Sequence, residues 1–304
     1  MDRSITTMID PLLCKGCGRC VQVCPLKTLS IRGEKASVTG TESLNCGHCA
    51  AVCPHGAITV ASLAPEMSRF RLFKTSEKPL PPGEFDIGKL VHLFQSIRSC
   101  RHFSKTPVNR ACLEDLIKIG ITAPSGGNSQ QWVFTILSDG DAVAALTKRI
   151  FEFYKKINSM AKKSRLRSML KLIGKAELED YYYKHYMTVR NMLNNFGEDH
   201  DPLFHGATAA IIISMKEGTN FPAEDALFAA SRIQTAAHCM GLGTFFNGIA
   251  LKAMQHDPEI NQFIQLLPSE KPYAVIGLGY PLVAYQTVVG RKQADIRYFS
   301  LPKD

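Results

Sequence analysis

The sequence lacks the segments that direct a chain into or across a membrane. Its start, MDRSITTMIDPLLCKG, has no basic stretch followed by an apolar run, the pattern of a secretory signal peptide. No stretch reaches the roughly 18 consecutive apolar residues of a membrane-spanning helix. We therefore expect a cytoplasmic protein without a membrane span, in a reducing compartment where cysteines bind metals rather than form disulfides.

Motifs of several other chemistries are also missing. No G-x-x-x-x-G-K-[ST] stretch is present, so phosphoryl transfer has no phosphate-binding loop. The VIGLGYP stretch, residues 275–281, begins like a dinucleotide-binding motif, but it lacks the third glycine and Pro281 interrupts the helix that should follow. The nine histidines are scattered, and no nucleic-acid reader motif accompanies the net charge of +9. Nucleic acid is therefore not an expected partner.

Acidic residues are absent between Phe153 and Glu177, where eight basic residues occur. These are Lys155, Lys156, Lys162, Lys163, Arg165, Arg167, Lys171 and Lys175. Leu166, Leu170 and Ile173 recur among them at helical spacing. A solvated helix face explains this pattern, and docking of an acidic protein or a membrane surface is the alternative.

Cysteine, in contrast, is concentrated near the N-terminus. Seven of the ten cysteines precede residue 54, in a segment with few large aromatic residues, so this part needs metal or cross-links for stability. Within residues 1–62, CKGCGRCVQVCP (14–25) superposes on SLNCGHCAAVCP (43–54) after a shift of 29 residues. Each copy ends in a turn that leads into a short alternating strand. The repeat predicts a pseudo-twofold module.

The C-x2-C-x2-C-x3-C-P spacing provides soft thiolate ligands suited to iron–sulfur clusters. This region resembles the bacterial two-cluster ferredoxins, in which the fourth cysteine of each motif binds the other cluster. The resemblance implies two [4Fe–4S] clusters. One would be held by Cys14, Cys17, Cys20 and Cys53, and the other by Cys24, Cys46, Cys49 and the Ser43 position. A four-thiolate zinc site is the main alternative.

Ser43 stands where the repeat has a cysteine. A serine oxygen is harder and far more basic than a thiolate, and is therefore a poorer cluster ligand. Three outcomes follow: a [4Fe–4S] cluster with an alkoxide ligand, a three-iron cluster, or a labile site. The later cysteines, Cys100, Cys112 and Cys239, are expected to be small buried residues.

Two regions follow the cysteine-rich module. Residues 63–88 contain four prolines and little periodicity, which predicts a linker. From residue 89 to 304 helical and strand-like patterns alternate, as in a mixed domain. The helical patterns lie at 89–98, 111–121, 141–156 and 223–240, and the strand-like runs are WVFTIL, AAIIISM and YAVIGLGY.

Three stretches of this second domain carry groups suited to a flavin nucleotide. In RSCR (98–101), two guanidinium groups flank the hydroxyl of Ser99, a set that holds a phosphate dianion. In APSGGNSQQW (123–132), a Gly-Gly bend permits close approach to a planar ligand, and Asn128 offers a donor and an acceptor. GLGTFFNG (241–248) reads as a turn after an alanine-rich helix, with backbone N–H groups for a ring edge.

In this order the three stretches resemble the FMN-dependent nitroreductase family from about Leu90 to Arg297. The resemblance implies an α+β fold with a central sheet flanked by helices, and a homodimer that builds its two FMN sites at the subunit interface. The N–H groups of Asn247 and Gly248 would meet the N5 and O4 edge of the flavin. The implied FMN-binding set is Arg98, Ser99, Arg101, Pro124, Ser125, Gly126, Asn128, Asn247, Gly248 and Arg291, with Lys292 as the alternative to Arg291.

Together the two resemblances predict an iron–sulfur flavoprotein oxidoreductase. Its clusters would pass single electrons to FMN, which would reduce a small acceptor such as a nitroaromatic or an activated alkene. No side chain is assigned as a catalytic acid or base, because the cofactor carries the chemistry. A ferredoxin, a flavodoxin or NAD(P)H is the expected donor. The alternative function is an electron-transfer adaptor that relays electrons to a partner protein.

Overall fold

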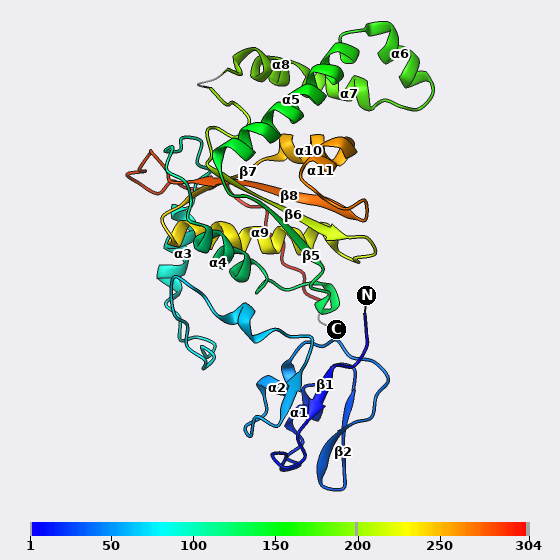
Figure 1. Cartoon of the computed structure of the whole chain (residues 1–304), viewed down its shortest axis with the longest axis vertical. Helices are drawn as coiled ribbons and strands as arrows, with labels where there is room; N and C mark the ends of the chain where they lie inside the picture. The colour runs from blue at the N-terminus through cyan, green and yellow to red at the C-terminus, as the bar shows by residue number, and fades with distance from the viewer. Residues whose placement is uncertain (1, 198–199, 302–304) are drawn as a thin grey trace.

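The computed structural model describes residues 2–197 and 200–301, which form a small N-terminal module and a larger α+β domain (Figure 1). In the module, β1 (Thr7–Ile9) pairs with β4 (Ile58–Val60), and β2 (Leu29–Arg32) pairs with β3 (Lys35–Val38), both antiparallel. Two one-turn helices, α1 (Arg19–Gln22) and α2 (His48–Ala51), lie against each other. The two copies of the repeat therefore fold into the same succession of helix, turn and strand, as the sequence predicted.

The same glycine conformation starts both short helices. Gly18 and Gly47 each have φ of 75°, in the left-handed region that glycine adopts without steric cost. The second and third cysteines of each motif flank this glycine. The glycine thus lets the chain turn between two cysteines that face the same side.

The larger domain is built on one antiparallel sheet of four strands in the order β5-β6-β8-β7. Three of them confirm the strand-like runs of the sequence. These strands are β5 (Trp132–Leu137), β6 (Ala209–Lys216) and β8 (Glu270–Gly279). The fourth, β7 (Gly243–Phe246), corrects the sequence analysis, which took residues 241–248 as a turn. A strand forms there because Phe245 is buried against Gly277 of β8, whose missing side chain makes room for the aromatic ring.

Helices cover both faces of this sheet (Figure 1). Strand β6 is buried on both sides, so its residues alternate between two cores: Ile211 and Ile213 face one, and Ala210 and Ile212 face the other. The first core includes α4 (Arg110–Gly120) and α9 (Pro222–Cys239). The second includes α5 (Gly140–Ala161), α10 (Gly248–His256) and α11 (Pro258–Phe263). The expected α+β fold with a sheet between helices is confirmed.

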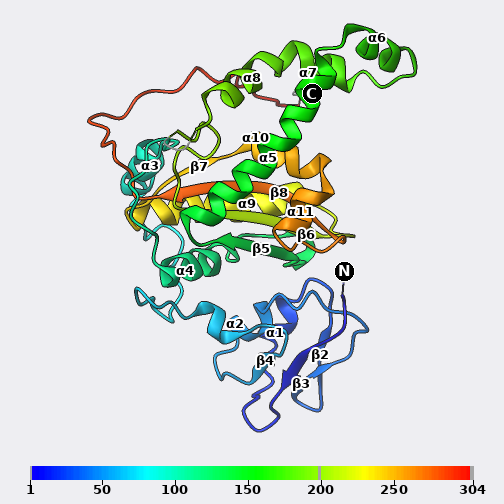
Figure 2. The ribbon, with the colours of Figure 1, turned by 45° about the horizontal axis from the view of Figure 1, so that its top comes forward.

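Helix boundaries follow local capping. The side chains of Asp86, Asn109 and Asp139 accept N–H groups at the starts of α3 (Ile87–Ser96), α4 and α5. The four expected helices are therefore present, with ends shifted by a few residues. Three helices that the sequence analysis did not specify form a bundle against the C-terminal half of α5 (Figure 2): α6 (Ser164–Leu172), α7 (Glu177–Lys184) and α8 (Tyr186–Asn195). In the described ranges, no helix is long and apolar enough to cross a membrane.

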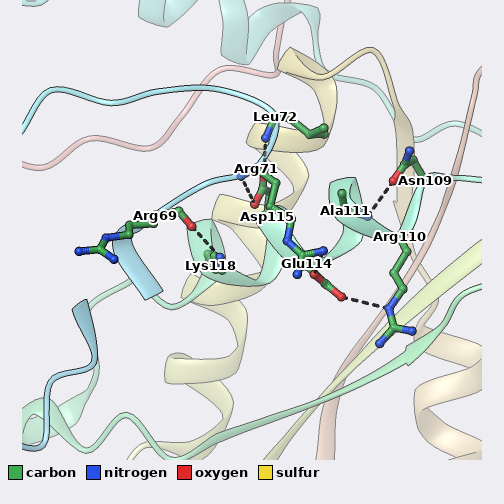
Figure 3. A network of polar contacts seen from close by, with 9 residues as sticks. All are labelled: Arg69, Arg71, Leu72, Asn109, Arg110, Ala111, Glu114, Asp115 and Lys118. Atoms are coloured by element: carbon green, nitrogen blue, oxygen red, sulfur yellow. Dashed lines mark hydrogen bonds and ion pairs between the residues drawn. The ribbon is translucent and has the colours of Figure 1, made fainter. Parts of the chain in front are cut away.

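The segment between module and domain is attached to α4 (Figure 3). After a short 3-10 helix, η1 (Pro65–Ser68), the carboxylate of Asp115 accepts the backbone N–H of Arg71 at 2.9 Å and that of Leu72 at 2.9 Å. Asp115 is fully buried, and Lys118 Nζ donates to the carbonyl oxygen of Arg69 at 2.6 Å. The predicted linker is thus tied to the domain at residues 69–72.

Candidate cofactor sites

The four positions assigned to the first cluster line one cavity. Cys14 and Cys20 are buried, Cys17 is exposed, and Cys53 comes from the second copy of the repeat. The N–H of Ala36 donates to Cys14 Sγ at 3.3 Å, and this bond is the main reason that the pKa of the Cys14 thiol is lowered. The cavity therefore has the donor set of a four-thiolate iron–sulfur cluster.

A matching cavity lies in the other half of the module. It is lined by Cys24, Cys46 and Cys49 and by Ser43, so the structure brings the serine to the place of the fourth ligand. Ser43 is 7% exposed, and its Oγ accepts the N–H of Asn45 at 3.0 Å. This cavity has the residues for a cluster with three thiolates and one oxygen.

The last cysteine of each repeat copy lines the cavity of the other copy, and both of these cysteines accept a similar hydrogen bond. Thr28 N–H donates to Cys24 Sγ at 3.2 Å, and Ala57 N–H donates to Cys53 Sγ at 3.3 Å, in both cases four residues along the chain. Burial acts to raise the pKa of Cys24, but the hydrogen bonds from Thr28, together with backbone groups of Leu26 and Leu29, outweigh it, and the net shift is downward. Backbone donors of this kind favour a sulfur that carries negative charge, as in a cluster ligand.

His48 is a contact of the second cavity that the sequence analysis missed. Its Nδ1 lies 2.8 Å from Cys46 Sγ, and the equivalent position of the first copy is Arg19. The signal was present in the motif, because His48 stands between two ligand cysteines. In the described part of the chain, no three His, Cys, Asp or Glu side chains are grouped closely enough to hold a single metal ion, which fits cysteines spaced around a larger iron–sulfur cluster rather than one ion.

The predicted phosphate groups lie at one corner of the four-stranded sheet. Arg98 and Arg101 line a cavity of about 690 Å³ together with Gly243, where β7 begins, and Val288 of the C-terminal segment. Ser99 forms an isolated parallel bridge with Thr244, and Cys100 N–H donates to the Thr244 carbonyl oxygen at 2.9 Å. These contacts fix the RSCR stretch beside the start of β7.

Arg291 returns to the same corner. Its Nη1 donates to the carbonyl oxygen of Val289 at 3.2 Å, and Arg98 Nη2 donates to that same oxygen at 3.3 Å. Two guanidinium groups that share one acceptor lie close to each other although 193 positions separate them in sequence. Arg101 lines the same cavity as Arg98, so the corner gathers cationic donors suited to a phosphate dianion.

Asn247 and Gly248, predicted to meet the edge of the flavin ring, lie at the other end of β7, where Asn247 makes hydrogen bonds within the fold instead. Asn247 N–H donates to the Val275 carbonyl oxygen at 2.8 Å, and its side chain caps α10 through the N–H of Ala250 while donating to Leu203 O. Asn247 is therefore a buried structural residue, and its N–H is not free for a flavin. Gly248, the first residue of α10, is exposed, and a Cβ added there would meet nothing within 4 Å.

Gly248 opens into a cavity of about 730 Å³ between α5, α10 and the α6–α8 bundle. Tyr154 and Tyr181 lie in its wall, and burial raises the pKa of both phenols, which remain neutral near pH 7. Lys252 and His256 of α10 add polar groups. A wall that combines aromatic rings with a few polar groups is typical of a pocket for small aromatic molecules.

The loop with the Gly-Gly bend lies elsewhere. Gly126 N–H donates to Asp225 Oδ1 at 2.9 Å, and Ser129 Oγ donates to Asp225 Oδ2 at 3.2 Å, which fixes the loop at the start of α9. Gly127 and Asn128 have φ of 58° and 56°, so the bend uses the left-handed conformation that glycine favours. Within one chain, Pro124, Ser125, Gly126 and Asn128 do not join the arginine corner.

The separation follows from the sheet. The loop leads into β5 at one edge, and the arginine corner adjoins β7 at the opposite edge, three strand spacings or about 14 Å away. Trp132 is level with Lys271 of β8, whereas Gly243 is level with Gly279, eight residues or about 26 Å further along. The two parts of the predicted flavin site occupy diagonally opposite corners of the sheet.

One of the three later cysteines differs from the expectation. Cys100 and Cys112 are buried as predicted, but Cys239 is exposed, because it is the last residue of α9 and lies on the outer face of that helix.

The basic stretch is partly engaged in contacts within the fold. Arg167 stacks at 3.8 Å over the ring of Tyr182 and contacts the carbonyl oxygen of Ala161, and Lys171 forms a 3.0 Å ion pair with Glu179. Part of the basic charge thus serves the packing of the α6–α8 bundle.

Family models match both parts of the chain. Residues 96–280 match the model described as "Nitroreductase family", and residues 6–60 match the model described as "4Fe-4S dicluster domain". The two matches agree with the division between module and domain in Figure 1.

Curated relatives and solved structures give more distant similarities. An iodotyrosine deiodinase of Haliscomenobacter hydrossis is 26% identical over 199 residues, which cover 60% of this chain and 75% of that protein. A Caenorhabditis elegans iodotyrosine dehalogenase 1 homolog is 30% identical over 91 residues, or 30% of this chain and 27% of the relative. A Bacteroides fragilis nitroreductase with bound FMN superposes with a TM-score of 0.47 at 17% identity, covering 71% of this chain and 99% of that chain.

Proposed function

The chain belongs to the nitroreductase family, and from this premise we propose that it is an iron–sulfur flavoenzyme that reduces a small organic acceptor. Electrons would enter at clusters held by the N-terminal 4Fe-4S dicluster domain and leave from FMN held by the larger domain. When bound, clusters of this type carry single electrons, and FMN supplies hydride transfer. The acceptor that the proposal favours is a nitroaromatic or a related electron-poor small molecule.

One observation carries this proposal: β7 joins a cationic corner to a large open cavity. The corner with Arg98 and Arg101 provides charge-assisted donors for the phosphate of FMN. Four residues of strand later, Gly248 opens into the cavity of α5, α10 and the α6–α8 bundle. A flavin aligned along β7 would thus have its phosphate at the arginines and its reactive ring at the pocket.

The residues of this chain contribute binding and orientation rather than proton transfer. Gly243 allows close backbone approach, since a Cβ there would lie 2.7 Å from that of Cys100. The start of α10 presents the exposed Gly248, and a helix N-terminus favours negative charge near its N–H groups. Tyr154 and Tyr181 form an aromatic wall on one side of the pocket.

The iron–sulfur part of the proposal rests on the fit of the two cavities. Each is lined by four residues at the positions that the repeat pairs with each other, and both receive backbone N–H donors at sulfur. The first, with Cys14, Cys17, Cys20 and Cys53, would hold a [4Fe–4S] cluster. The second would hold a cluster that Ser43 leaves one thiolate short.

We further propose that the protein works as a homodimer with two FMN sites. The Gly-Gly loop and the arginine corner are too far apart in one chain to contact the same flavin, so a complete site needs two chains. The outer face of α9 supports this, because Leu227 and Phe228 are 50% and 51% exposed and Phe221 is 53% exposed. Such neighbouring apolar side chains favour burial against another subunit.

Turnover by the purified holoprotein tests the proposed function. The assay measures reduction of a nitroaromatic and of an activated alkene under anaerobic conditions, with reduced ferredoxin, reduced flavodoxin and NAD(P)H each supplied as donor. We expect turnover with at least one donor and about one FMN per chain. A protein that binds FMN and clusters but reduces no small acceptor would instead be an adaptor that relays electrons to a partner protein.

A further inference from the structure

The N-terminal module touches the larger domain through its second half. The side-chain amide of Asn128 donates to the carbonyl oxygens of Leu44 and Asn45, at 3.0 and 3.2 Å. Leu44 and Asn45 lie between Ser43 and Cys46 and line the same cavity as both. The second cluster position, and not the first, therefore faces the larger domain.

This contact is held from both sides. On the domain side, Asp225 is 2% exposed and binds Gly126 and Ser129 of the loop that carries Asn128. On the linker side, the buried Asp115 binds the backbone at residues 71 and 72 (Figure 3). The module is thus anchored at two separate points, and the position of its second cavity relative to the sheet is fixed.

The fixed position is far from the arginine corner of the same chain. Asn128 precedes β5 at one corner of the sheet, whereas Arg98 and Arg101 lie at the diagonally opposite corner, about 14 Å across and about 26 Å along. The two corners also lie at opposite ends of α9: Asp225 near its start binds the loop, and His238 near its end lines the arginine cavity. The ring, proposed at the Gly248 end of β7, is nearer than the arginines: Asn247 bonds to Val275, four residues or about 13 Å along from Lys271, but the ring is still about 14 Å across the sheet. Because electron transfer slows steeply with distance, delivery to the flavin of the same chain is disfavoured.

A twofold dimer removes this separation. When two copies of α9 pack side by side around a twofold axis perpendicular to them, they run antiparallel, so the start of one lies near the end of the other. The loop and the docked module of one chain then lie beside the arginine cavity of its partner. This step rests on the FMN-binding homodimer that we propose above.

We propose that each module delivers electrons across the dimer interface, from its serine-containing second site to the FMN held by the partner subunit's Arg98 and Arg101. Each transfer oxidises the second cluster by one electron, and an external one-electron protein donor reduces the module again. Two transfers, with two protons from solvent, convert one oxidised FMN to FMNH2. Asn128 is the positioning residue that holds the exit site of the module against the domain.

Heterodimers with differently tagged chains test the direction of transfer. In the split heterodimer, one chain carries Arg98→Ala and Arg101→Ala, and the other carries Cys46→Ala and Cys49→Ala. Its single flavin is held by the second chain and lies beside the intact module of the first. In the stacked heterodimer, one chain carries all four substitutions and the other is wild type, so the single flavin lies beside the altered module.

The readout is the rate of flavin bleaching after anaerobic mixing with reduced ferredoxin, with iron and flavin contents measured on every sample. The homodimer with the two cysteine substitutions gives the background rate of direct reduction. We expect the split heterodimer to bleach at the wild-type rate per flavin and the stacked heterodimer at background. The reverse result, or equal rates in both, overturns transfer across the interface. If the wild type also bleached only at the background rate, the clusters would not deliver electrons to FMN at all, and the proposed function itself would be contradicted.

A second measurement, independent of electron transfer, tests the positioning role of Asn128. Hydrogen exchange is followed in the wild-type holoprotein, in Asn128→Asp and in Asn194→Asp, an exposed control in α8. Asn128→Asp replaces the donor amide with an acceptor that repels the two carbonyl oxygens. We expect several-fold faster exchange at residues 42–46 and slower bleaching, with unchanged iron content. Unchanged exchange in Asn128→Asp would refute the docking contact.

Discussion

Asp115 and Arg71 are joined by hydrogen bonds of 2.9 and 3.0 Å from one backbone N–H to both carboxylate oxygens, across 44 residues of sequence. A fully buried carboxylate is stable only when donors surround it, and here the donors are the backbone of the linker. This relationship turns a proline-rich segment into a fixed connection between two redox units (Figure 3).

Asp115→Asn should detach the linker from α4. The amide keeps the shape of the carboxylate but loses its charge and presents a donor to the N–H groups, so we expect a loss of about 1–3 kcal/mol in the free energy of unfolding. Protease cleavage between residues 69 and 72 should also become faster. Chemical denaturation and timed proteolysis measure the two effects.

Glu114→Gln is the matched control for that variant. Glu114 forms ion pairs with Arg71 and Arg110 from the neighbouring position, but its partners are 63% and 85% exposed. We expect a change below about 1 kcal/mol. Equal effects of the two variants would mean that the buried carboxylate does not hold the linker.

Replacing Arg98 and Arg101 together with alanine should release the flavin, because its phosphate loses two charge-assisted partners. The flavin content after gel filtration should fall well below that of the wild type. Arg110→Ala, at an exposed arginine of α4, should keep full occupancy. Full occupancy in the double variant would contradict the phosphate assignment.

Ser43→Cys should make the iron content uniform. With serine at this position the second cluster lacks one thiolate, so we expect aerobic purification of the wild type to give a heterogeneous iron count and a three-iron signal in the oxidised protein. The cysteine variant should contain two [4Fe–4S] clusters. If the anaerobic wild type already holds two complete clusters whose potentials match those of the variant, Ser43 has no effect on the cluster.

Charge reversal at Lys162, Lys163 and Arg165 tests whether the basic stretch binds an acidic redox protein. We expect a slower association with reduced ferredoxin and a weaker dependence of that rate on ionic strength. Arg167 and Lys171 are left intact, because their side chains contact Tyr182 and Glu179 within the bundle. An unchanged rate with each candidate donor would identify this stretch as a solvated surface.

His205 should make stability depend on pH. Burial lowers the pKa of His205 below its ordinary value; Arg101 and His102 lower it further, and Asp201 opposes the shift. As pH falls, the unfolded chain therefore binds a proton at a higher pH than the folded protein does. The stability contributed by neutral His205 is therefore present above about pH 6.5 and is lost as pH falls through the folded pKa. Denaturation across this range should show a decline that His205→Asn reduces and that His256→Asn, at an exposed site, does not.

Much of the fold followed from local patterns. The repeat of cysteines predicted the two halves of the module, and the runs WVFTIL, AAIIISM and YAVIGLGY predicted β5, β6 and β8. Strand β7 was missed because its formation depends on Gly277 in a distant strand, which no local pattern reveals. Cys239 was misjudged for a related reason: the composition of a helix does not say which face meets the core.

The sequence by itself determined the chemical groups of this protein, since residue types and their spacing are sufficient to define thiolate sets and arginine pairs. Only the tertiary structure decided how those groups are distributed. It brought Ser43 into the second cavity and Arg291 to Arg98, and it occupied the N–H of Asn247 with Val275. It also set Asn128 and Arg98 at opposite corners of one sheet, because strand order and register are fixed by long-range pairing and burial that sequence spacing does not encode.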